Sequence, residues 1–170
     1  MDLKSYIRDI PDFPEEGILF KDITPLLKTT PAFCYAVDAI ADFLGSKKTD
    51  AIVSIEARGF FFGAALAYRL NKPLVPIRKE GKLPFSTKSV SYALEYGTDT
   101  LEIHEDGVMI GQEVVIVDDV LATGGTVEAA CRLVGNIGAK VSGLAFLIEL
   151  GFLNGRKNLA KYDICSLITY

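Results

Sequence analysis

The sequence has few residues of the kinds that bind metals or form disulfides. Its 170 residues contain one histidine, His104, and three cysteines, Cys34, Cys131 and Cys165, which lie far apart along the chain. A single histidine without a cysteine pair excludes an ordinary zinc site built from protein ligands. An odd number of widely spaced cysteines favours reduced thiols over a disulfide framework. We therefore expect a cytoplasmic protein with no metal site of its own.

Long apolar runs and basic runs are also missing. The longest apolar stretch, around residues 59–68, is too short to cross a bilayer. The charged start, MDLKSYIRDI, has no signal-peptide core. The net charge is -4 and no cluster of basic residues is present, which argues against nucleic acid as a partner. We expect no membrane partner, and a single domain over residues 1–170, because this length suffices for one hydrophobic core.

The most informative stretch is VVIVDDVLATGGTVEAA, residues 114–130. The β-branched run at 114–117 predicts a strand buried on both faces, which is typical of parallel sheets. Asp118 and Asp119 follow it, and we expect them to end the strand. A turn of glycine and threonine comes next, and a helical pattern begins near residue 127. The predicted order is strand, acidic pair, turn and helix.

This order predicts a site for a sugar phosphate. A helix N-terminus offers unpaired N–H groups and the positive end of a dipole, and a glycine pair lets the backbone approach a ligand. Two adjacent carboxylates after a buried strand repel each other, and a sugar diol would donate hydrogen bonds to both. The alternative is an ordinary strand-turn-helix unit in which Asp and Thr are only caps. Neither common phosphate motif, G-x-x-x-x-G-K-[ST] or G-x-G-x-x-G, is present at this turn.

The stretch VVIVDDVLATGGT resembles the ribose-phosphate signature of type I phosphoribosyltransferases. The resemblance implies that Asp118 and Asp119 hold the ribose hydroxyls. It also implies that the 5′-phosphate is held by the turn residues, which are Ala122, Thr123, Gly124, Gly125 and Thr126.

Residues 10–27, IPDFPEEGILFKDITPLL, contain three prolines and predict no regular structure. Their apolar residues, Phe13, Ile18, Leu19 and Phe20, indicate that the segment packs on something. It is either a strap over the core or a lid over an aromatic ligand, with Phe20 as the stacking ring.

The segment resembles the hood of the adenine-specific branch of the family, whose pattern is D-[FY]-P-x-x-G-[IV]-x-F-[RK]-D-I-[ST]-P-L. The resemblance implies a hood over residues 1–30 and adenine contacts from Leu19, Phe20 and Lys21. A later Glu-Leu pair, residues 149–150, resembles the family's pair in which the leucine faces the base, so Leu150 joins this set. Without the resemblance, Leu150 is simply a core residue.

A second strand-loop-helix unit covers residues 51–70. A buried strand at 51–55 leads into Glu56, Ala57 and Arg58, and then into an apolar helix. By pattern alone, Glu56 and Arg58 form either a local ion pair or part of an anion site. The loop resembles the family's pyrophosphate loop, in which a serine stands where Ala57 stands here, so any contact from that hydroxyl is lost. The resemblance also implies a cis peptide between Glu56 and Ala57.

Residues 73–103 predict a strand at 73–78 followed by a hairpin, with strands at 91–96 and near 101–103. The segment from 80 to 93 looks flexible and is basic, which indicates either a solvated surface or a loop that closes on an anion. In the family this region is a mobile lid, here residues 79–103, in which an L-E-Y-G motif supplies Glu95 as a general acid or base. Phe85 departs from the family's G-K-L-P-G-P pattern at the loop tip. The implied pyrophosphate group is Glu56, Ala57, Arg58, Arg78, Lys79 and Lys82, with Arg58 also catalytic.

Further patterns predict helices at 2–9, 32–44 and 127–136 and strands at 140–149 and 163–170. Alternating strands and helices indicate an α/β fold, with a Rossmann-like, mostly parallel sheet flanked by helices. The resemblance implies a homodimeric enzyme of purine salvage that transfers the 5-phosphoribosyl group from phosphoribosyl pyrophosphate to adenine, giving AMP and pyrophosphate. Mg²⁺ would arrive with the substrate.

Three alternatives remain. A 6-oxopurine phosphoribosyltransferase would share the central motif, but the hood pattern argues against it. A purine-sensing regulator on this fold would need a DNA-binding domain, for which we expect no spare residues. A non-catalytic dinucleotide-binding module would lack the paired aspartates.

Overall fold

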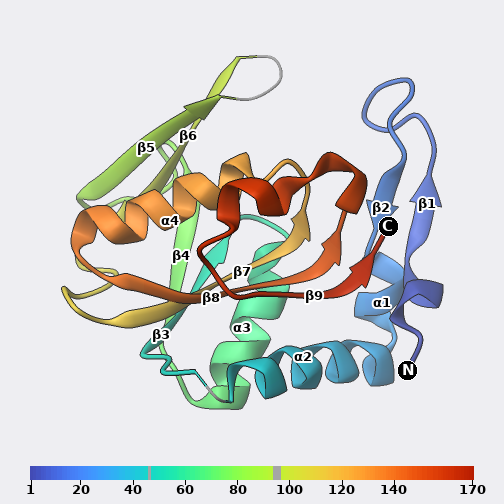
Figure 1. Ribbon diagram of the computed structural model, residues 1–170, viewed down its shortest axis with the longest axis horizontal. Helices are drawn as coiled ribbons and strands as arrows, with labels where there is room; N and C mark the ends of the chain where they lie inside the picture. The colour runs from blue at the N-terminus through green and yellow to red at the C-terminus, as the bar shows by residue number, and fades with distance from the viewer. Residues whose placement is uncertain (46, 94–96) are drawn as a thin grey trace.

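The computed structural model describes residues 1–45, 47–93 and 97–170. Within these ranges the main sheet has seven strands in the order β5-β6-β4-β3-β7-β8-β9 (Figure 1). The strands β4, β3, β7, β8 and β9 are parallel, whereas β6 pairs antiparallel with β4, and β5 pairs antiparallel with β6. The predicted α/β fold with a mostly parallel sheet is confirmed. The strand bounds are β3 Ala51–Ile55, β4 Leu74–Lys79, β5 Thr87–Ala93, β6 Thr98–His104, β7 Glu113–Leu121, β8 Lys140–Glu149 and β9 Ile164–Thr169.

Helices cover both faces of this sheet (Figure 1). On one face lie α2 (Thr30–Leu44) and α3 (Gly59–Leu70), and on the other lies α4 (Gly125–Ile137). The alternation of strand side chains divides the core between the two faces. Val114 and Ile116 pack in the cluster that contains the α4 residues, and Val115 and Val117 pack in the cluster with α2 and α3. Both faces of β7 are therefore buried, as its unbroken apolar run predicted.

The acidic pair does not end the central strand, so that prediction is wrong. Strand β7 continues through Asp118 and Asp119 to Leu121 and stays paired with β8, where Asp118 lies opposite Phe146. The ladder hydrogen bonds to a long parallel neighbour outweigh the weak strand preference of aspartate.

The N-terminal segment also differs from its prediction. Instead of a helix over 2–9, a 3₁₀ turn η1 (Leu3–Tyr6) precedes a short strand β1 (Arg8–Ile10). Residues 10–27, predicted as irregular, contain strand β2 (Phe20–Asp22) and most of helix α1 (Thr24–Lys28). Strands β1 and β2 pair antiparallel as a separate two-stranded ribbon. Their pairing joins residues about twelve apart, which local periodicity does not register.

The apolar residues of this segment do not all pack. Phe13, Ile18 and Leu19 have exposed fractions of 51, 44 and 49%, so the packing prediction is wrong for them. Phe20 is half-buried, and Phe13 meets it edge-on with ring centroids 5.1 Å apart. The segment therefore covers part of the core, through the fully buried Ile23 and Leu26 that pack in the cluster with α2 and α3, and it also presents apolar side chains at the surface.

The hairpin differs in extent. Strand β5 begins at Thr87, so the end of the stretch predicted as flexible is regular. Leu94, Glu95 and Tyr96, which include the predicted acid or base, lie outside the described residues. Strand β5 lies along α4 (Figure 1). After β8, the chain forms two 3₁₀ turns, η2 (Gly151–Leu153) and η3 (Gly155–Leu159), and no helix in the described ranges is long and apolar enough to span a membrane.

Candidate active site

The predicted polar residues converge at the carboxyl ends of three neighbouring parallel strands. Glu56 and Arg58 follow β3, Arg78 ends β4 with Lys79, and the acidic pair lies in the second half of β7. Ligands of open α/β sheets bind at this edge. The fold therefore gathers residues as far apart in the sequence as Glu56 and Asp119.

The two aspartates are buried carboxylates. Their exposed fractions are 9% for Asp118 and 6% for Asp119, and Asp118 Oδ1 accepts a hydrogen bond of 2.9 Å from the Asp119 N–H. Burial, with the charge of Asp119 beside it, raises the pKa of Asp118 well above the ordinary range. Burial also raises the pKa of Asp119, although the Arg58 guanidinium opposes this. Burial therefore disfavours the charged form of both side chains.

One carboxylate oxygen is left without a donor. Arg58 Nε lies 2.7 Å from Asp119 Oδ2, but its N–H does not point at that oxygen. Among the described residues, this oxygen is buried and has no hydrogen-bond partner. A buried acceptor in this state is costly, and a ligand hydroxyl would satisfy it.

The turn after β7 is shaped by two glycines. Gly124 has φ +88° and precedes α4, and a Cβ there would lie 2.6 Å from the carbonyl oxygen of Gly155. A Cβ on Gly155 would in turn clash with the carbonyl of Ala122. Sequence reasoning missed Gly155, although its Asn154-Gly155 dipeptide is a turn signal. The close contact between the two glycines fixes the turn that leads into α4. As in any helix, the first N–H groups of α4 have no helical hydrogen-bond partner, so they can bind an anion.

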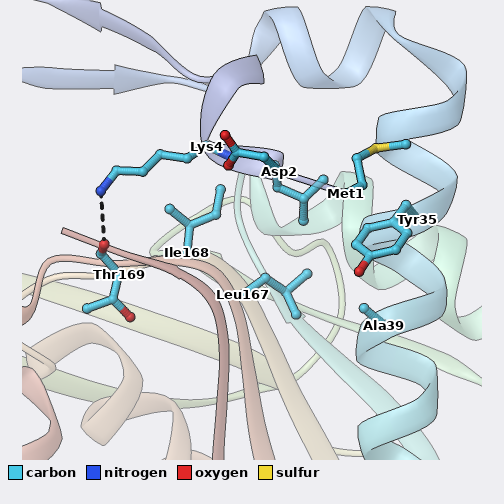
Figure 2. Close-up of a pocket in the computed structure, with 9 residues that line it drawn as sticks. Met1, Asp2, Lys4, Tyr35, Ala39, Leu167, Ile168 and Thr169 are labelled. Atoms are coloured by element: carbon cyan, nitrogen blue, oxygen red, sulfur yellow. Dashed lines mark hydrogen bonds between the residues drawn. The ribbon is translucent and has the colours of Figure 1, made fainter.

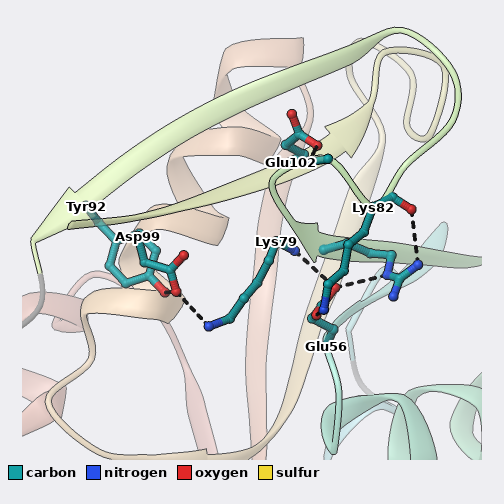
Figure 3. Close-up of polar contacts among 8 residues, drawn as sticks. Glu56, Lys79, Lys82, Tyr92, Asp99 and Glu102 are labelled. Atoms are coloured by element: carbon teal, nitrogen blue, oxygen red, sulfur yellow. Dashed lines mark hydrogen bonds and ion pairs between the residues drawn. The ribbon is translucent and has the colours of Figure 1, made fainter. Parts of the chain in front are cut away.

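The hairpin contacts this turn through a chain of polar side chains. Thr126 Oγ1 donates to the Tyr92 hydroxyl (3.3 Å). That hydroxyl donates to Asp99 Oδ2 (3.3 Å), and Lys79 Nζ lies 2.9 Å from the same oxygen (Figure 3). Burial raises the pKa of Tyr92, and the hydrogen bond to Asp99 raises that of Lys79. A cleft of about 390 Å³, with Thr123 on its lining, lies between β5 and the first turns of α4.

A second polar group surrounds Glu56. Arg78 Nε donates to Oε2 at 3.0 Å, Lys82 Nζ to Oε1 at 2.6 Å, and the Lys79 N–H to Oε2 at 3.0 Å (Figure 3). Burial raises the pKa of Glu56, but these hydrogen bonds outweigh it, so the pKa lies below its ordinary value. The alternative of a Glu56–Arg58 pair is wrong, because Glu56 pairs with Arg78 and Lys82. The peptide between Glu56 and Ala57 is cis, as the resemblance implied.

Arg58 does not pair with Glu56 and instead contacts Phe20 and Lys21 of β2. Its Nη1 donates to the Lys21 carbonyl at 3.2 Å, and its guanidinium carbon lies 4.7 Å from the centroid of the Phe20 ring. Leu150 is half-buried, and its N–H donates to the carbonyl of Leu121, which places it near the end of β7. Leu19, the residue before Phe20, is exposed.

A separate hollow of about 320 Å³ lies where η1 meets α2 and β9 (Figure 2). Its lining includes Asp2, Tyr35 and Leu167, and none of the predicted site residues. The predicted site residues therefore lie at the carboxyl edge of the sheet and not in this hollow.

A parallel sheet with an acidic pair and a glycine turn leading into a helix at its carboxyl edge is typical of α/β proteins that bind phosphorylated ligands. The family model described as the phosphoribosyl transferase domain matches residues 26–167. The chain belongs to the phosphoribosyltransferase family.

Individual relatives agree with this assignment. An adenine phosphoribosyltransferase from Thermotoga neapolitana is 59% identical over 170 residues, with both chains fully covered. The crystal structure of an adenine phosphoribosyltransferase from Thermoanaerobacter pseudethanolicus has a TM-score of 0.97 and 57% identity, over 99% of this chain and 98% of that one. The Giardia lamblia enzyme complexed with 9-deazaadenine has a TM-score of 0.94 and 33% identity, over 99% and 96%.

Proposed function

We propose that this protein transfers the 5-phosphoribosyl group from phosphoribosyl pyrophosphate to adenine, giving AMP and pyrophosphate in cytoplasmic purine salvage. The observation that carries the proposal is the buried Asp119 Oδ2, which has no hydrogen-bond donor among the described residues. In the sequence, a short turn separates the strand that carries Asp119 from the N-terminus of α4, whose first N–H groups have no helical partner. A ribose 5-phosphate group would donate hydroxyl hydrogen bonds to Asp119 and place its phosphate at the N-terminus of α4. The relatives named adenine phosphoribosyltransferase support the choice of base.

In this proposal, Asp118 and Asp119 accept hydrogen bonds from the ribose hydroxyls. The turn residues 122–126 hold the 5′-phosphate with backbone N–H groups and the Thr123 and Thr126 hydroxyls. Arg78 and Lys82, which pair with Glu56, and Lys79, which pairs with Asp99, turn toward the pyrophosphate and stabilise its charge as it leaves.

Adenine would lie against the hood ribbon, with Phe20 as the stacking ring and Leu150 facing the base. Backbone groups around Phe20 and Lys21 can accept from the exocyclic amine and donate to N1, a pattern opposite to that of a 6-oxopurine. N9 would then attack the anomeric carbon as pyrophosphate leaves, through an oxocarbenium-like state. The protein's part is positioning, charge stabilisation and exclusion of water.

The acid-base assignment to Glu95 stays a prediction, because Glu95 lies outside the described residues. Mg²⁺ would enter on the pyrophosphate, and the acidic pair would meet it only through the ribose hydroxyls. When bound, it would neutralise part of the charge on the leaving group. Among the described residues, no group of three or more His, Cys, Asp or Glu side chains could hold an ion without the substrate.

We also propose a homodimer formed through the outer face of α3. Phe61 and Tyr68, seven positions apart and therefore on one side of the helix, have exposed fractions of 50% and 92%. Large apolar residues gathered on one face in this way indicate an interaction surface.

The activity is tested by incubating the protein with adenine, phosphoribosyl pyrophosphate and Mg²⁺ and measuring AMP and pyrophosphate. We expect equal amounts of both products, and none from a variant carrying Asp118→Asn and Asp119→Asn together. Because both residues lie at the edge of the core, the double variant should fold, which circular dichroism would verify. Normal turnover by the folded double variant would refute the assigned role of the pair.

A further inference from the structure

The ribbon of β1 and β2 needs an anchor outside itself. Each strand has three residues, and the ribbon is not hydrogen-bonded to the main sheet. An isolated two-stranded ribbon is at best marginally stable in water. Under the proposed function, β2 carries Phe20 and Lys21, so whatever fixes this strand also fixes the surface on which the base binds.

The side chain of Lys21 is the candidate anchor. It is only 8% exposed, which is rare for lysine. Its Nζ lies 2.7 Å from Asp9 Oδ1 on β1 and 3.8 Å from the centroid of the Tyr170 ring. A buried ammonium over an aromatic face makes a strong cation–π contact because little water competes for it. Asp9 belongs to the ribbon, so it is the contact with Tyr170 that connects the Lys21 side chain to the rest of the fold.

Tyr170 is itself fixed to the main sheet. It follows β9, its N–H donates to the Glu149 carbonyl (3.0 Å), and its own carbonyl accepts from Gly151 (2.9 Å). In Figure 1, this end of the chain lies beside β2. Burial raises the pKa of Tyr170, which keeps the phenol neutral beside two ammonium groups. The ring is therefore a fixed point on the carboxyl edge of the sheet.

The opposite side of Lys21 is also held. Its carbonyl accepts from Arg58, so the residue is tied by its backbone to the active-site loop and by its side chain to Tyr170. A second ammonium, that of Lys4, lies 4.1 Å from the same ring and 3.3 Å from the Thr169 carbonyl (Figure 2). Lys4 is exposed and belongs to η1, not to the ribbon. A substitution of Lys4 therefore removes a cation from the Tyr170 ring without changing the ribbon, and it serves as the control for Lys21.

We propose that Tyr170 is a positioning residue for the purine base: its ring holds the Lys21 ammonium and so fixes the Phe20–Lys21 backbone at the adenine subsite. The inference rests on the proposed function. Tyr170 touches neither substrate, and it acts through Lys21. Loss of the ring should therefore weaken the binding of the base and leave the binding of phosphoribosyl pyrophosphate, which involves other elements, unaffected.

The test compares steady-state kinetics of the full chain for Tyr170→Leu, Tyr170→Phe and Lys4→Met. We expect Tyr170→Leu to raise KM for adenine about tenfold, in line with the loss of a desolvated cation–π contact. The KM for phosphoribosyl pyrophosphate and kcat should stay within twofold. Tyr170→Phe keeps the aromatic face and should restore the adenine KM, and Lys4→Met should match the wild type.

The outcomes separate the inference from the proposed function. An unchanged adenine KM in Tyr170→Leu, or an equal rise of both KM values, would overturn the positioning role. If Tyr170→Leu does not fold, Lys21→Met tests the same contact from its other side, and an unchanged adenine KM there would also overturn it. Failure of the wild type to make AMP would instead refute the proposed function.

Discussion

Arg58 Nε lies 2.7 Å from Asp119 Oδ2, and the same guanidinium lies over the ring of Phe20. One side chain therefore links the carboxylate assigned to the ribose with the ring assigned to the base. Asp119 is buried, and the Arg58 guanidinium compensates its charge. Asp119 Oδ2 nevertheless has no aligned hydrogen-bond donor among the described residues.

We expect Arg58→Gln to lower the free energy of unfolding by about 1–3 kcal/mol, because it leaves the Asp119 carboxylate buried without a cation. Adding Asp119→Asn should recover most of this loss, since the charge is then gone. Urea unfolding of the two single variants and the double variant measures the coupling between the residues. Additive losses would show that the short contact contributes nothing to stability.

Asp118→Asn should stabilise the ligand-free protein at neutral pH while it impairs activity. The pKa of Asp118 in the fold is raised above its ordinary value of 3.8, so the native state binds a proton more tightly than the unfolded chain does. The stabilisation from that proton is present at acidic pH and is lost as the pH rises through the raised pKa. Asparagine keeps the Oδ1 acceptor and removes this loss.

Thermal unfolding across the acidic to neutral range should show a flatter pH profile for Asp118→Asn than for the wild type. Catalytic efficiency should fall about ten- to hundredfold, which corresponds to the loss of a hydrogen bond to a charged group. A lower melting temperature at neutral pH would contradict the assigned burial cost.

The sequence predicts the central units well for a physical reason. Strands β3, β7 and β8 are largely buried, so each contains a run of mostly apolar residues, and each is followed by turn residues at the ligand edge. The acidic pair and the glycine turn could be found because they are local. The end of β7 could not, because its extension depends on the pairing of Leu121 with Glu149 on β8.

The remaining features depend on long-range contacts that periodicity does not encode. The hood ribbon exists because β1 meets β2, and Lys21 is buried because Tyr170, almost 150 positions later, lies against it. Likewise, Gly155 supports the phosphate turn from a segment that, in the sequence, is only a turn signal.

The hairpin should close further on the bound substrates. In the ligand-free protein, Tyr92 already bridges Thr126 and Asp99, and Lys79 is paired with Asp99. Phosphate and pyrophosphate would compete for Thr126 and Lys79, so binding should exchange these contacts for contacts with the ligand. We expect amide exchange in residues 80–93 to slow when phosphoribosyl pyrophosphate and an unreactive adenine analogue are added.

Tyr92→Phe serves as the matched variant for this experiment. It should exchange faster than the wild type without ligand, because both bridging hydrogen bonds are lost, and reach similar protection with ligand. Protection confined to residues 118–126 would show that the hairpin is only a connection.

Tyr68→Asp should weaken the proposed dimer. A carboxylate at the centre of an apolar interface is costly to bury, whereas the tyrosine side chain is 92% exposed in the single chain and contributes little to its fold. Light scattering after size exclusion should show a dimeric wild type and a monomeric variant with an unchanged melting profile at low concentration. Tyr35→Asp, an exposed aromatic on α2, is the control and should remain dimeric. A monomeric wild type would remove the α3 face from consideration as an interface.

Catalytic efficiencies for adenine, hypoxanthine and guanine test whether adenine is the acceptor. The Lys21 backbone would pair with adenine but leave buried polar groups unpaired with a 6-oxopurine, at about 1–3 kcal/mol for each group. With saturating phosphoribosyl pyrophosphate and Mg²⁺, we expect kcat/KM for adenine to exceed that for either 6-oxopurine by at least about a hundredfold. Comparable efficiency on hypoxanthine would contradict it.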